Sequence, residues 1–223
     1  MRTLYIVSTP IGNLGDITYR SLEVLKSVDL VLCEDTRVTG KLLNHFDIKK
    51  PLIAFNDFNE EKKITSVISD FELGKDIALV SDAGTPLISD PGFKLVRESL
   101  AKGINVVPIP GVSAATAALV ASGLPTDKFM FIGYLPKKEG KRKKILGEVK
   151  RINALLPTTM IFYESPYRVL KLLSKINEDF DDIDIVVCRE LTKMHEEIRR
   201  EKVTDAILHF NKVAPKGEFV VLI

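Results

Sequence analysis

Ile77-Ala-Leu-Val-Ser-Asp-Ala-Gly-Thr-Pro-Leu-Ile-Ser-Asp-Pro-Gly92 is the stretch of sequence that decides the fold. Its apolar start ends in Ser81 and Asp82 and gives way to glycines and prolines, a pattern that indicates a buried strand followed by a rigid loop. In an open parallel sheet, ligands bind in the crevice beyond the carboxyl ends of the strands. We therefore expect Asp82 to hold a polar group of a ligand.

The sequence around this stretch alternates between strand and helix patterns up to residue 124. Short runs rich in branched residues predict strands at 3–8, 29–34, 52–55, 76–81 and 104–109. Capping and glycine signals predict helices at 17–28, 59–74, 91–102 and 113–121. This order is typical of βαβ units, so residues 1–124 are expected to form an α/β domain with a mainly parallel sheet and flanking helices.

The remaining residues, 125–223, predict a second domain of mixed α/β type. Helix propensity stops in Gly123-Leu-Pro-Thr-Asp127, which we interpret as the joint between the domains. Strands are expected at 129–133, 159–163, 183–188, 196–202 and 218–223, and helices at 166–177 and 204–211. No linker is long enough to let the halves drift apart, so they are expected to share a permanent cleft.

Composition indicates a globular protein with a substantial core. Hydrophobic residues make up 45% and charged residues 28% of the 223 residues. Cys33 and Cys188 lie in apolar, strand-like runs, which predicts buried reduced thiols rather than a disulfide framework. The sequence shows no secretory segment and no run of about 18 apolar residues, so a cytoplasmic location is expected.

Several enzyme classes lack their signature in this sequence. No two glycines are two residues apart and no G-x-x-x-x-G-K stretch occurs, which disfavours ordinary dinucleotide binding and P-loop nucleotide hydrolysis. The three histidines, His45, His195 and His209, are scattered. Neither a metal site nor a Ser-His-Asp arrangement is therefore expected.

The net charge of +2 is unevenly distributed along the chain. Residues 137–151 hold eight basic side chains and two acidic ones, a local excess of six positive charges. The basic side chains of this block are Lys137, Lys138, Lys141, Arg142, Lys143, Lys144, Lys150 and Arg151. Such a block attracts polyanions such as nucleic-acid backbones, although charge alone also fits a solvated helix face that binds nothing.

Polar clusters follow several of the expected strands. In addition to Ser81 and Asp82 they are Ser8-Thr-Pro-Ile-Gly-Asn-Leu-Gly-Asp16, Glu34-Asp-Thr-Arg37, Pro110-Gly-Val-Ser-Ala114, Phe162-Tyr-Glu-Ser-Pro-Tyr-Arg168 and Arg189-Glu-Leu-Thr-Lys193. Each fits a structural interpretation as a turn, an ion-pair latch or a buried carboxylate–arginine pair. Convergence of these clusters on one cleft would instead indicate a binding or catalytic site.

Together with Ser89-Asp-Pro-Gly92, these clusters resemble the motifs of the ribosomal small subunit RNA 2′-O-ribose methyltransferase I family, within the tetrapyrrole methylase-like group. They follow the family's order over nearly the whole chain. The resemblance implies two α/β domains with S-adenosylmethionine in the cleft between them, a homodimer, and methylation of a cytidine 2′-hydroxyl in the decoding region of 16S rRNA. One departure is Tyr167, where the family has histidine, whereas Glu164 and Arg168 are in place.

The resemblance also assigns roles to residues of this chain. The implied cofactor-binding residues are Pro10, Ile11, Ser81, Asp82, Ala83, Ser113, Ala114, Tyr163 and Glu164. Candidates for proton removal or for orienting RNA phosphates are Glu34, Asp35, Arg37, Glu164, Arg168, Arg189, Glu190 and Lys193. Residues expected to bind the RNA backbone are Lys137, Lys138, Lys141, Arg142, Lys143 and Lys144. No metal is expected, and the sequence does not identify the general base.

Three other functions remain open. A methyltransferase for a precorrin or another small tetrapyrrole would share the fold but would not need the basic block. A diphthamide-pathway enzyme is a second relative, which the opening Thr9-Pro-Ile-Gly-Asn-Leu-Gly15 disfavours. A non-catalytic RNA-binding assembly factor would bind no S-adenosylmethionine.

Overall fold

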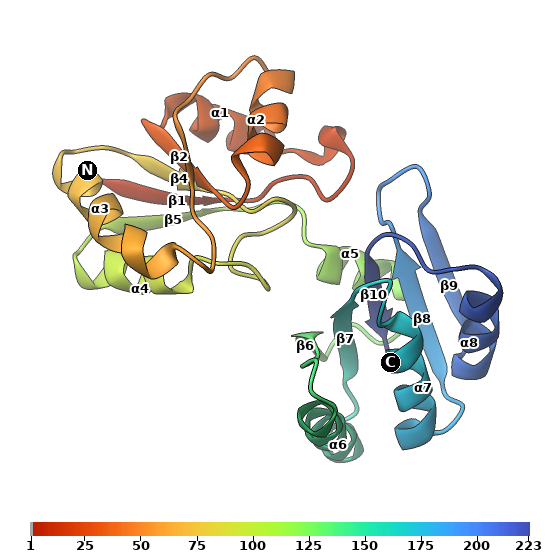
Figure 1. Cartoon of the computed structure of the whole chain (residues 1–223). Coiled ribbons are helices and arrows are strands. Elements are labelled where there is room, and N and C mark those ends of the chain that lie inside the picture. The colour runs from red at the N-terminus through yellow and green to blue at the C-terminus, as the bar shows by residue number, and fades with distance from the viewer. Residues whose placement is uncertain (1) are drawn as a thin grey trace. The chain divides into compact units, whose positions relative to one another are not determined.

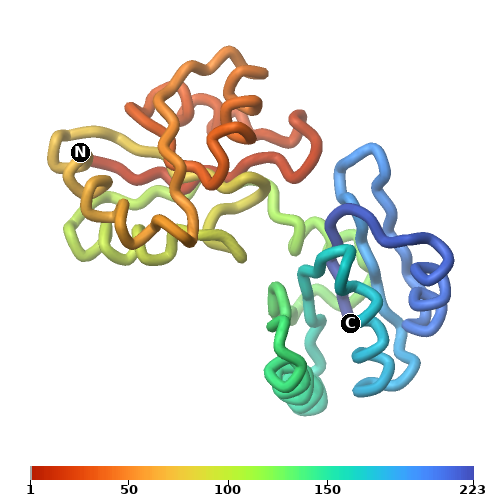
Figure 2. Tube along the Cα trace, in the orientation of Figure 1, coloured from red at the N-terminus to blue at the C-terminus, as the bar shows by residue number. Residues whose placement is uncertain are grey.

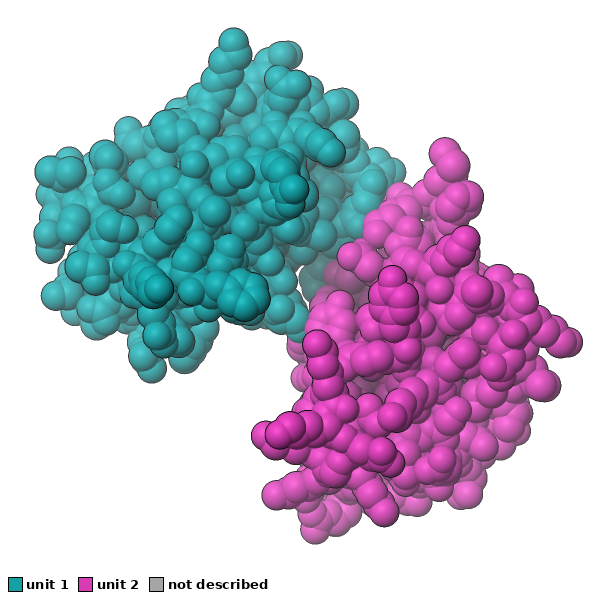
Figure 3. All heavy atoms as spheres, in the orientation of Figure 1, with its two compact units in different colours: residues 1–113 teal, residues 114–223 magenta. Residues whose placement is uncertain are grey.

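The computed structural model describes residues 2–223, which fold as two compact units (Figure 1). The first unit ends at Ser113 and the second begins at Ala114 (Figure 2 and Figure 3). The boundary predicted from the sequence lies at residue 124. The difference is helix α5 (Ala114–Ser122), whose buried side, which includes Ala118 and Leu119, packs on strands of the second unit.

The sheet of the first unit is parallel, as predicted. Its strands are β1 (Thr3–Val7), β2 (Leu30–Cys33), β3 (Leu52–Ala54), β4 (Ile77–Leu79) and β5 (Asn105–Ile109), in the order β3-β2-β4-β1-β5. β2 and β4 are buried along their whole length, which is why they read as continuous apolar runs. Because the strands run the same way, the loops that follow them leave one edge of the sheet, here called the carboxyl edge.

Helices cover both faces of this sheet (Figure 1). α1 (Tyr19–Ser27) and α2 (Thr36–His45) pack on one face, and α3 (Glu60–Glu72) and α4 (Phe93–Ala101) pack on the other. A short 3-10 helix, η1 (Leu14–Asp16), lies in the loop after β1. α2, for which the sequence patterns predict no range, begins three residues after the last residue of β2.

The sheet of the second unit is mixed, which agrees with the predicted class. Its strands are β6 (Phe129–Tyr134), β7 (Thr159–Glu164), β8 (Asp184–Arg189), β9 (Glu197–Lys202) and β10 (Phe219–Leu222), in the order β6-β7-β10-β8-β9. β6 and β7 are parallel, and the other neighbouring pairs are antiparallel. β9 is the polar edge strand that the sequence predicted at 196–202.

One hydrophobic core joins this sheet to α6 (Glu139–Leu155), α7 (Val169–Phe180) and α8 (Val203–Lys212). α6 is not among the predicted helices, because the basic side chains of residues 137–151 obscure the spacing of its apolar positions. Leu146 and Val149 lie three residues apart and are buried, with Ile145 and Ile152 partly buried beside them. This spacing is that of an amphipathic helix.

Two expectations from composition can be compared with the structure. Cys33 and Cys188 are both buried free thiols, as predicted, and burial raises the pKa of Cys188 to about 12. Among residues 2–223, no helix combines the length and the apolar composition that a membrane crossing requires.

Candidate active site

The loops after β1 and β4 are joined through their backbones at the carboxyl edge. The Thr9 N–H donates to the Gly84 carbonyl at 2.8 Å, and the Gly84 N–H donates to the Thr9 carbonyl at 3.0 Å. The Thr9 hydroxyl also donates to the Ser81 carbonyl at 3.2 Å. These bonds fix both loops at the edge where the sequence predicted a ligand site.

The loop after β5 belongs to the same network. The Thr85 hydroxyl lies 3.0 Å from the Ser8 hydroxyl oxygen and donates to the Val112 carbonyl at 2.9 Å. Gly111 lies so close to Ser8 that an added Cβ would be 2.7 Å from the Ser8 Cβ. Any other residue at position 111 would therefore push two of the loops apart.

The predicted cofactor-binding residues of the β1 and β4 loops lie together. Ile11 contacts Gly84, because an added Cβ at Gly84 would be 3.3 Å from Ile11 Cγ2. The Ser81 hydroxyl donates to the Ala83 carbonyl at 3.3 Å. Pro10, Ile11 and Ser81 are buried, and Asp82 and Ala83 are exposed. The two exposed residues are thus the ones that can contact a ligand directly with their side chains.

Asp82 is connected to the loop after β2. Its Oδ1 accepts a hydrogen bond from the Asp35 N–H at 3.1 Å, and its own N–H donates to Glu34 Oε1 at 3.4 Å. As the carboxyl-edge rule predicts, Asp82 therefore lies beside the adjacent acids Glu34 and Asp35, from which it is 48 and 47 residues away in the sequence.

Asp35 and Arg37 form the ion-pair latch that the sequence suggested. Asp35 caps α2 by accepting the Arg37 N–H at 2.8 Å, and its two oxygens accept from the guanidinium of the same residue. The hydrogen bonds from Arg37 lower the pKa of Asp35 to about 2. A carboxylate held in this way is a weak proton acceptor at neutral pH.

Glu34 lies next to Asp35 but has no ion-pair partner among residues 2–223. Burial, together with the negative charges of Asp90 and Asp82, raises its pKa to about 7. Burial also raises the pKa of Asp90 to about 6, with a contribution from Asp82 and Asp57, although a hydrogen bond with Ser81 opposes it. We call Glu34, Asp57, Asp82 and Asp90 the acidic edge, because the negative charges of Asp90, Asp82 and Asp57 all contribute to the raised pKa of Glu34.

Asp57 and Asp90 are not among the site residues predicted from the sequence. Asp90 lies inside the quoted stretch, in Ser89-Asp-Pro-Gly92, and that position was its only signal. Asp57 follows β3, a strand for whose loop no role was predicted. Both residues become relevant only when the loops that follow β2, β3 and β4 are placed side by side.

The loop from β4 to α4 is anchored by a further residue that the sequence analysis missed. Glu60, 6% exposed, accepts a hydrogen bond from the Gly92 N–H at 3.2 Å. In the same loop Leu87 and Ser89 have φ angles of 71° and 70°. Residues other than glycine rarely adopt this left-handed backbone conformation, and local backbone strain of this kind is concentrated at functional sites.

In the second unit, Tyr163 supports the first turn of α5. Its hydroxyl accepts a hydrogen bond from the Ala115 N–H at 3.1 Å. Its ring packs edge-on against Phe131, with the ring centres 4.8 Å apart. Ser113 and Ala114, two of the predicted cofactor-binding residues, come directly before Ala115 in the chain. Tyr163 therefore fixes the backbone that follows this pair.

Glu164 and Arg168 form a buried ion pair. Glu164 is 3% exposed, and its Oε1 accepts from Arg168 Nη2 at 2.6 Å and from the Ser165 N–H at 2.8 Å. Arg168 also donates to the Leu135 carbonyl at 3.1 Å. These contacts tie the end of β7 to the segment after β6, which is a structural arrangement for both predicted residues.

Glu190 and Lys193 form a second ion pair at 2.8 Å. Burial tends to raise the pKa of Glu190, but the pKa is lowered on balance by hydrogen bonds from Lys193 and from the Glu218 N–H. An added Cβ at Gly217 would overlap the Glu190 side chain, so glycine leaves room for this carboxylate in its observed position. Arg189 pairs in turn with Glu197 at 3.4 Å. The predicted catalytic residues of the second unit, Glu164, Arg168, Arg189, Glu190 and Lys193, are therefore all in ion pairs within that unit.

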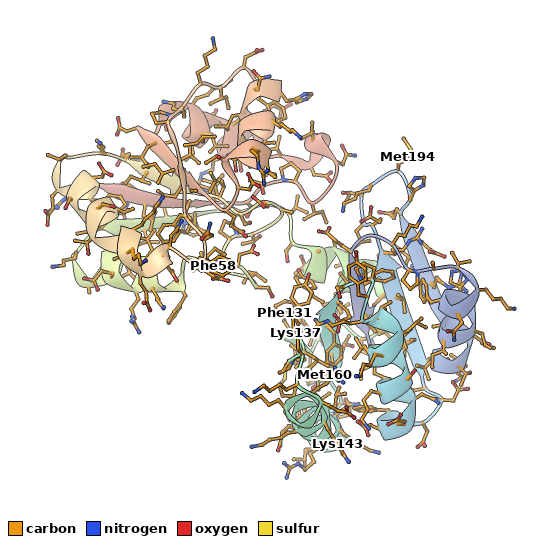
Figure 4. The ribbon with its side chains drawn as sticks, viewed as in Figure 1. Phe58, Phe131, Lys137, Lys143, Met160 and Met194 are labelled. Atoms are coloured by element: carbon orange, nitrogen blue, oxygen red, sulfur yellow. The ribbon has the colours of Figure 1, made fainter. Side chains whose placement is uncertain are left out.

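The basic block lies on and just before α6, and five of its six predicted RNA-binding residues are exposed (Lys137 and Lys143 are labelled in Figure 4). They are Lys137, Lys138, Lys141, Lys143 and Lys144. Lys143 and Lys144 line an open hollow on the surface of α6 together with Gly140, Gly147 and the ion-paired Glu148 and Arg151. This face of α6 is accessible to a polyanion.

Arg142 is the exception, because it is only 5% exposed. It lies four residues before the core residue Leu146, on the side of α6 that packs inward. This burial does not support the prediction that Arg142 binds the RNA backbone.

The chain consists of a parallel α/β unit with a loop-lined carboxyl edge and a following mixed α/β unit. This architecture is that of the two-domain tetrapyrrole methylases. The family model for tetrapyrrole (corrin/porphyrin) methylases matches residues 3–207, so the chain belongs to this family.

Curated relatives narrow this class. The chain is 47% identical to the ribosomal RNA small subunit methyltransferase I of Thermotoga maritima, over 100% of this chain and 98% of the relative. It is 48% identical to the protein of the same name from Escherichia coli O157:H7, over 99% of this chain and 77% of that one. The protein of that name from Halalkalibacterium halodurans is 46% identical over 99% of this chain and 75% of its own length.

Solved structures confirm the fold. A crystal structure of diphthine synthase matches with a TM-score of 0.78 and 16% identity, covering 99% of this chain and 89% of the other. Uroporphyrin-III-C-methyltransferase from Thermus thermophilus matches with a TM-score of 0.69 and 20% identity, covering 100% of this chain and 94% of the other. At these identities the likeness concerns the fold alone.

Proposed function

We propose that this protein methylates the 2′-hydroxyl of a cytidine in 16S rRNA and uses S-adenosylmethionine as the methyl donor. The similarity to small subunit rRNA methyltransferases over nearly the whole chain carries the proposal. The exposed basic residues of α6 support a polyanionic substrate. The reaction takes place in the cytoplasm, where small ribosomal subunits are made, and the active form is a homodimer.

The acidic edge of the first unit fits the charge of this donor. S-adenosylmethionine carries a sulfonium and an ammonium group, and when bound it supplies an electrophilic methyl group. Asp82 and Asp57 are the exposed carboxylates of this edge, and Glu34 adds a carboxylate that has no ion-pair partner among residues 2–223. We assign Asp82 and Ala83 to direct contact with the donor, and Pro10, Ile11 and Ser81 to the shape of the loops that hold it. Contacts to Ser113, Ala114, Tyr163 and Glu164 stay predictions.

Glu34 is the residue that we assign to proton removal. A general base works best when its pKa lies near the operating pH, and that of Glu34 is about 7. The other candidate acids, Asp35, Glu164 and Glu190, are each held by a basic side chain of their own unit. Glu34 takes the proton that the ribose hydroxyl loses, and the first unit aligns the reacting groups.

One assay tests the function. The protein is incubated with S-adenosylmethionine labelled in its methyl group and, separately, with unmodified small ribosomal subunits, free 16S rRNA and a tetrapyrrole. We expect label on a ribose of the rRNA, at the 2′-oxygen of a cytidine. Label on the tetrapyrrole alone would overturn the proposal, and absence of donor binding in calorimetry would favour a non-catalytic RNA-binding factor.

The basic face of α6 provides a second arm of this test. Lys143→Gln combined with Lys144→Gln removes two exposed cations, which should raise the KM for subunits and reduce the slope of log KM against log salt by about 2. Lys26→Gln combined with Lys102→Gln removes two exposed cations of the first unit and serves as the matched control. An equal response of the two double variants would contradict RNA binding by α6.

A further inference from the structure

The loop between β3 and α3 carries an aromatic ring that the proposed reaction does not yet use. Phe58 is 96% exposed and lies just before the first turn of α3 (Figure 4). Single exposed apolar side chains are common on protein surfaces, so exposure alone defines no site. The rigidity of the loop, its place in the fold and the charge around it are the observations that give Phe58 a role.

The loop holds Phe58 outward through hydrogen bonds of its own side chains. The Phe58 N–H donates to Asn56 Oδ1 at 3.2 Å, and the Asn56 N–H donates to Asn59 Oδ1 at 2.9 Å. The Asn59 amide in turn donates to the Ala54 carbonyl at 3.2 Å, at the end of β3. These hydrogen bonds fix the backbone that holds the ring in its exposed position. A binding partner therefore does not have to order the loop, and the entropic cost of binding is lower.

The loop lies at the carboxyl edge, beside the residues assigned to the reaction. Asp57, next to Phe58, contributes to the negative charge felt by Glu34 and Asp90. The helix that Phe58 precedes is joined to the start of α4 by the Glu60–Gly92 hydrogen bond. At that start lies a second aromatic ring, Phe93, which is 65% exposed.

The negative charge of the acidic edge favours contact with the bases of a nucleic acid over contact with its phosphates. Phosphate groups are repelled by the carboxylates of the acidic edge, whereas the faces of the bases are uncharged and stack on aromatic rings. A carboxylate accepts a hydrogen bond from the exocyclic amino group of cytosine. Uracil presents a carbonyl oxygen at the same position, which a carboxylate repels.

We propose that Phe58 stacks on the base of the nucleotide that is methylated and that Asp57 accepts a hydrogen bond from its amino group, so that the loop of residues 56–59 selects cytidine over uridine. This inference rests on the proposed function and adds a base site to it. The first unit then provides both the carboxylate that receives the ribose proton and the surface that positions the attached base.

The test compares variants at the two ends of α3 on unmodified small subunits. Phe58→Ala should raise the KM for subunits about tenfold or more, with the affinity for S-adenosylmethionine unchanged, and Phe58→Tyr should restore it. Leu73→Ala is the matched control, because Leu73 is 77% exposed at the far end of the same helix. Asp57→Asn should reduce the preference for subunits with cytidine over subunits with uridine at the target position by about tenfold.

The outcomes separate this inference from the proposed function. No methylation of rRNA by the unaltered protein would overturn the proposed function itself. Methylation by the unaltered protein with a Phe58→Ala KM equal to that of Leu73→Ala would overturn the role of Phe58. Loss of donor affinity in Phe58→Ala would show that the ring supports the donor site or the fold, and would also overturn base stacking.

Discussion

Two carboxylates at the carboxyl edge of the first unit, Glu34 and Asp90, differ from Glu164 and Glu190 of the second unit in how their charge is neutralised, whereas Asp35 of the same edge is paired with Arg37. At the carboxyl edge of the first unit, Glu34 and Asp90 lack ion-pair partners among the described residues, and their pKa values are raised to about 7 and about 6. In the second unit, Glu164 is paired with Arg168, and Glu190 with Lys193. The same residue type thus occurs in two electrostatic states within one chain.

This difference separates residues that organise the protein from residues that are ready for a ligand. A paired carboxylate has its negative charge satisfied and fixes the elements that carry it. A carboxylate without an ion-pair partner, close to other carboxylates, can bind a cationic ligand or accept a proton near neutral pH. By this criterion the first unit provides the reactive carboxylates, and the paired acids of the second unit provide support.

The largest expected effect is on catalysis by Glu34→Gln. Glutamine keeps the size of the side chain but accepts no proton, so kcat should fall by about a hundredfold to ten-thousandfold while donor affinity stays similar. Because a base must be unprotonated to act, kcat of the unaltered protein should fall as the pH drops below about 7. Single-turnover rates measured from pH 5 to 9 check both statements. A Glu34→Gln variant with full kcat would remove Glu34 from the reaction.

The next effect is on the stability of the second unit. Arg168→Met leaves Glu164 buried with its charge unpaired, which should lower the free energy of unfolding by about 3–5 kcal/mol. The double variant Glu164→Gln and Arg168→Met should recover most of this loss. Lys193→Met, at a more exposed pair, should cost less than about 1 kcal/mol. Urea unfolding of the three variants gives these values, and equal losses at Arg168 and Lys193 would break the distinction between buried and exposed pairs.

The smallest effect concerns the acidic edge and pH. The pKa of Asp90 is about 6 in the folded chain against an ordinary 3.8, so the folded state holds the proton more tightly than the unfolded state. The stability that Asp90 contributes is therefore lost as the pH rises from about 4 to about 6. Asp90→Asn should remove this loss and, after allowance for solvent screening, leave the variant about 1 kcal/mol more stable at pH 8. A variant less stable than the unaltered protein at pH 8 would contradict the assignment.

Much of the first unit follows from local sequence patterns. Branched apolar runs specify the strands, and the alternation with helices specifies their parallel arrangement. The carboxyl-edge rule then predicts that the residues after β2 and β4 meet, and the Asp35–Asp82 and Glu34–Asp82 hydrogen bonds bear this out.

Other features depend on packing that the sequence does not display. The charges of Asp57 and Asp90 matter because three distant loops meet, which no local pattern encodes. Arg142 reads as one more cation of a basic run, yet it shares the inward side of α6 with Leu146 and Val149. The small residues of α5 suit a close contact with any sheet, so their assignment to the second unit had no signal in the sequence.

The bare backbone of Gly147 on the cationic side of α6 has a practical consequence. A Cβ at this position would meet no atom within 4 Å, and glycine in a helix interior costs about 1 kcal/mol relative to alanine. Gly147→Ala should therefore raise the free energy of unfolding without disturbing an internal contact. The added methyl group would lie between Lys143 and Arg151 on the helix surface. If a polyanion approaches the helix backbone at this point, Gly147→Ala should raise the melting temperature and lower the affinity for rRNA.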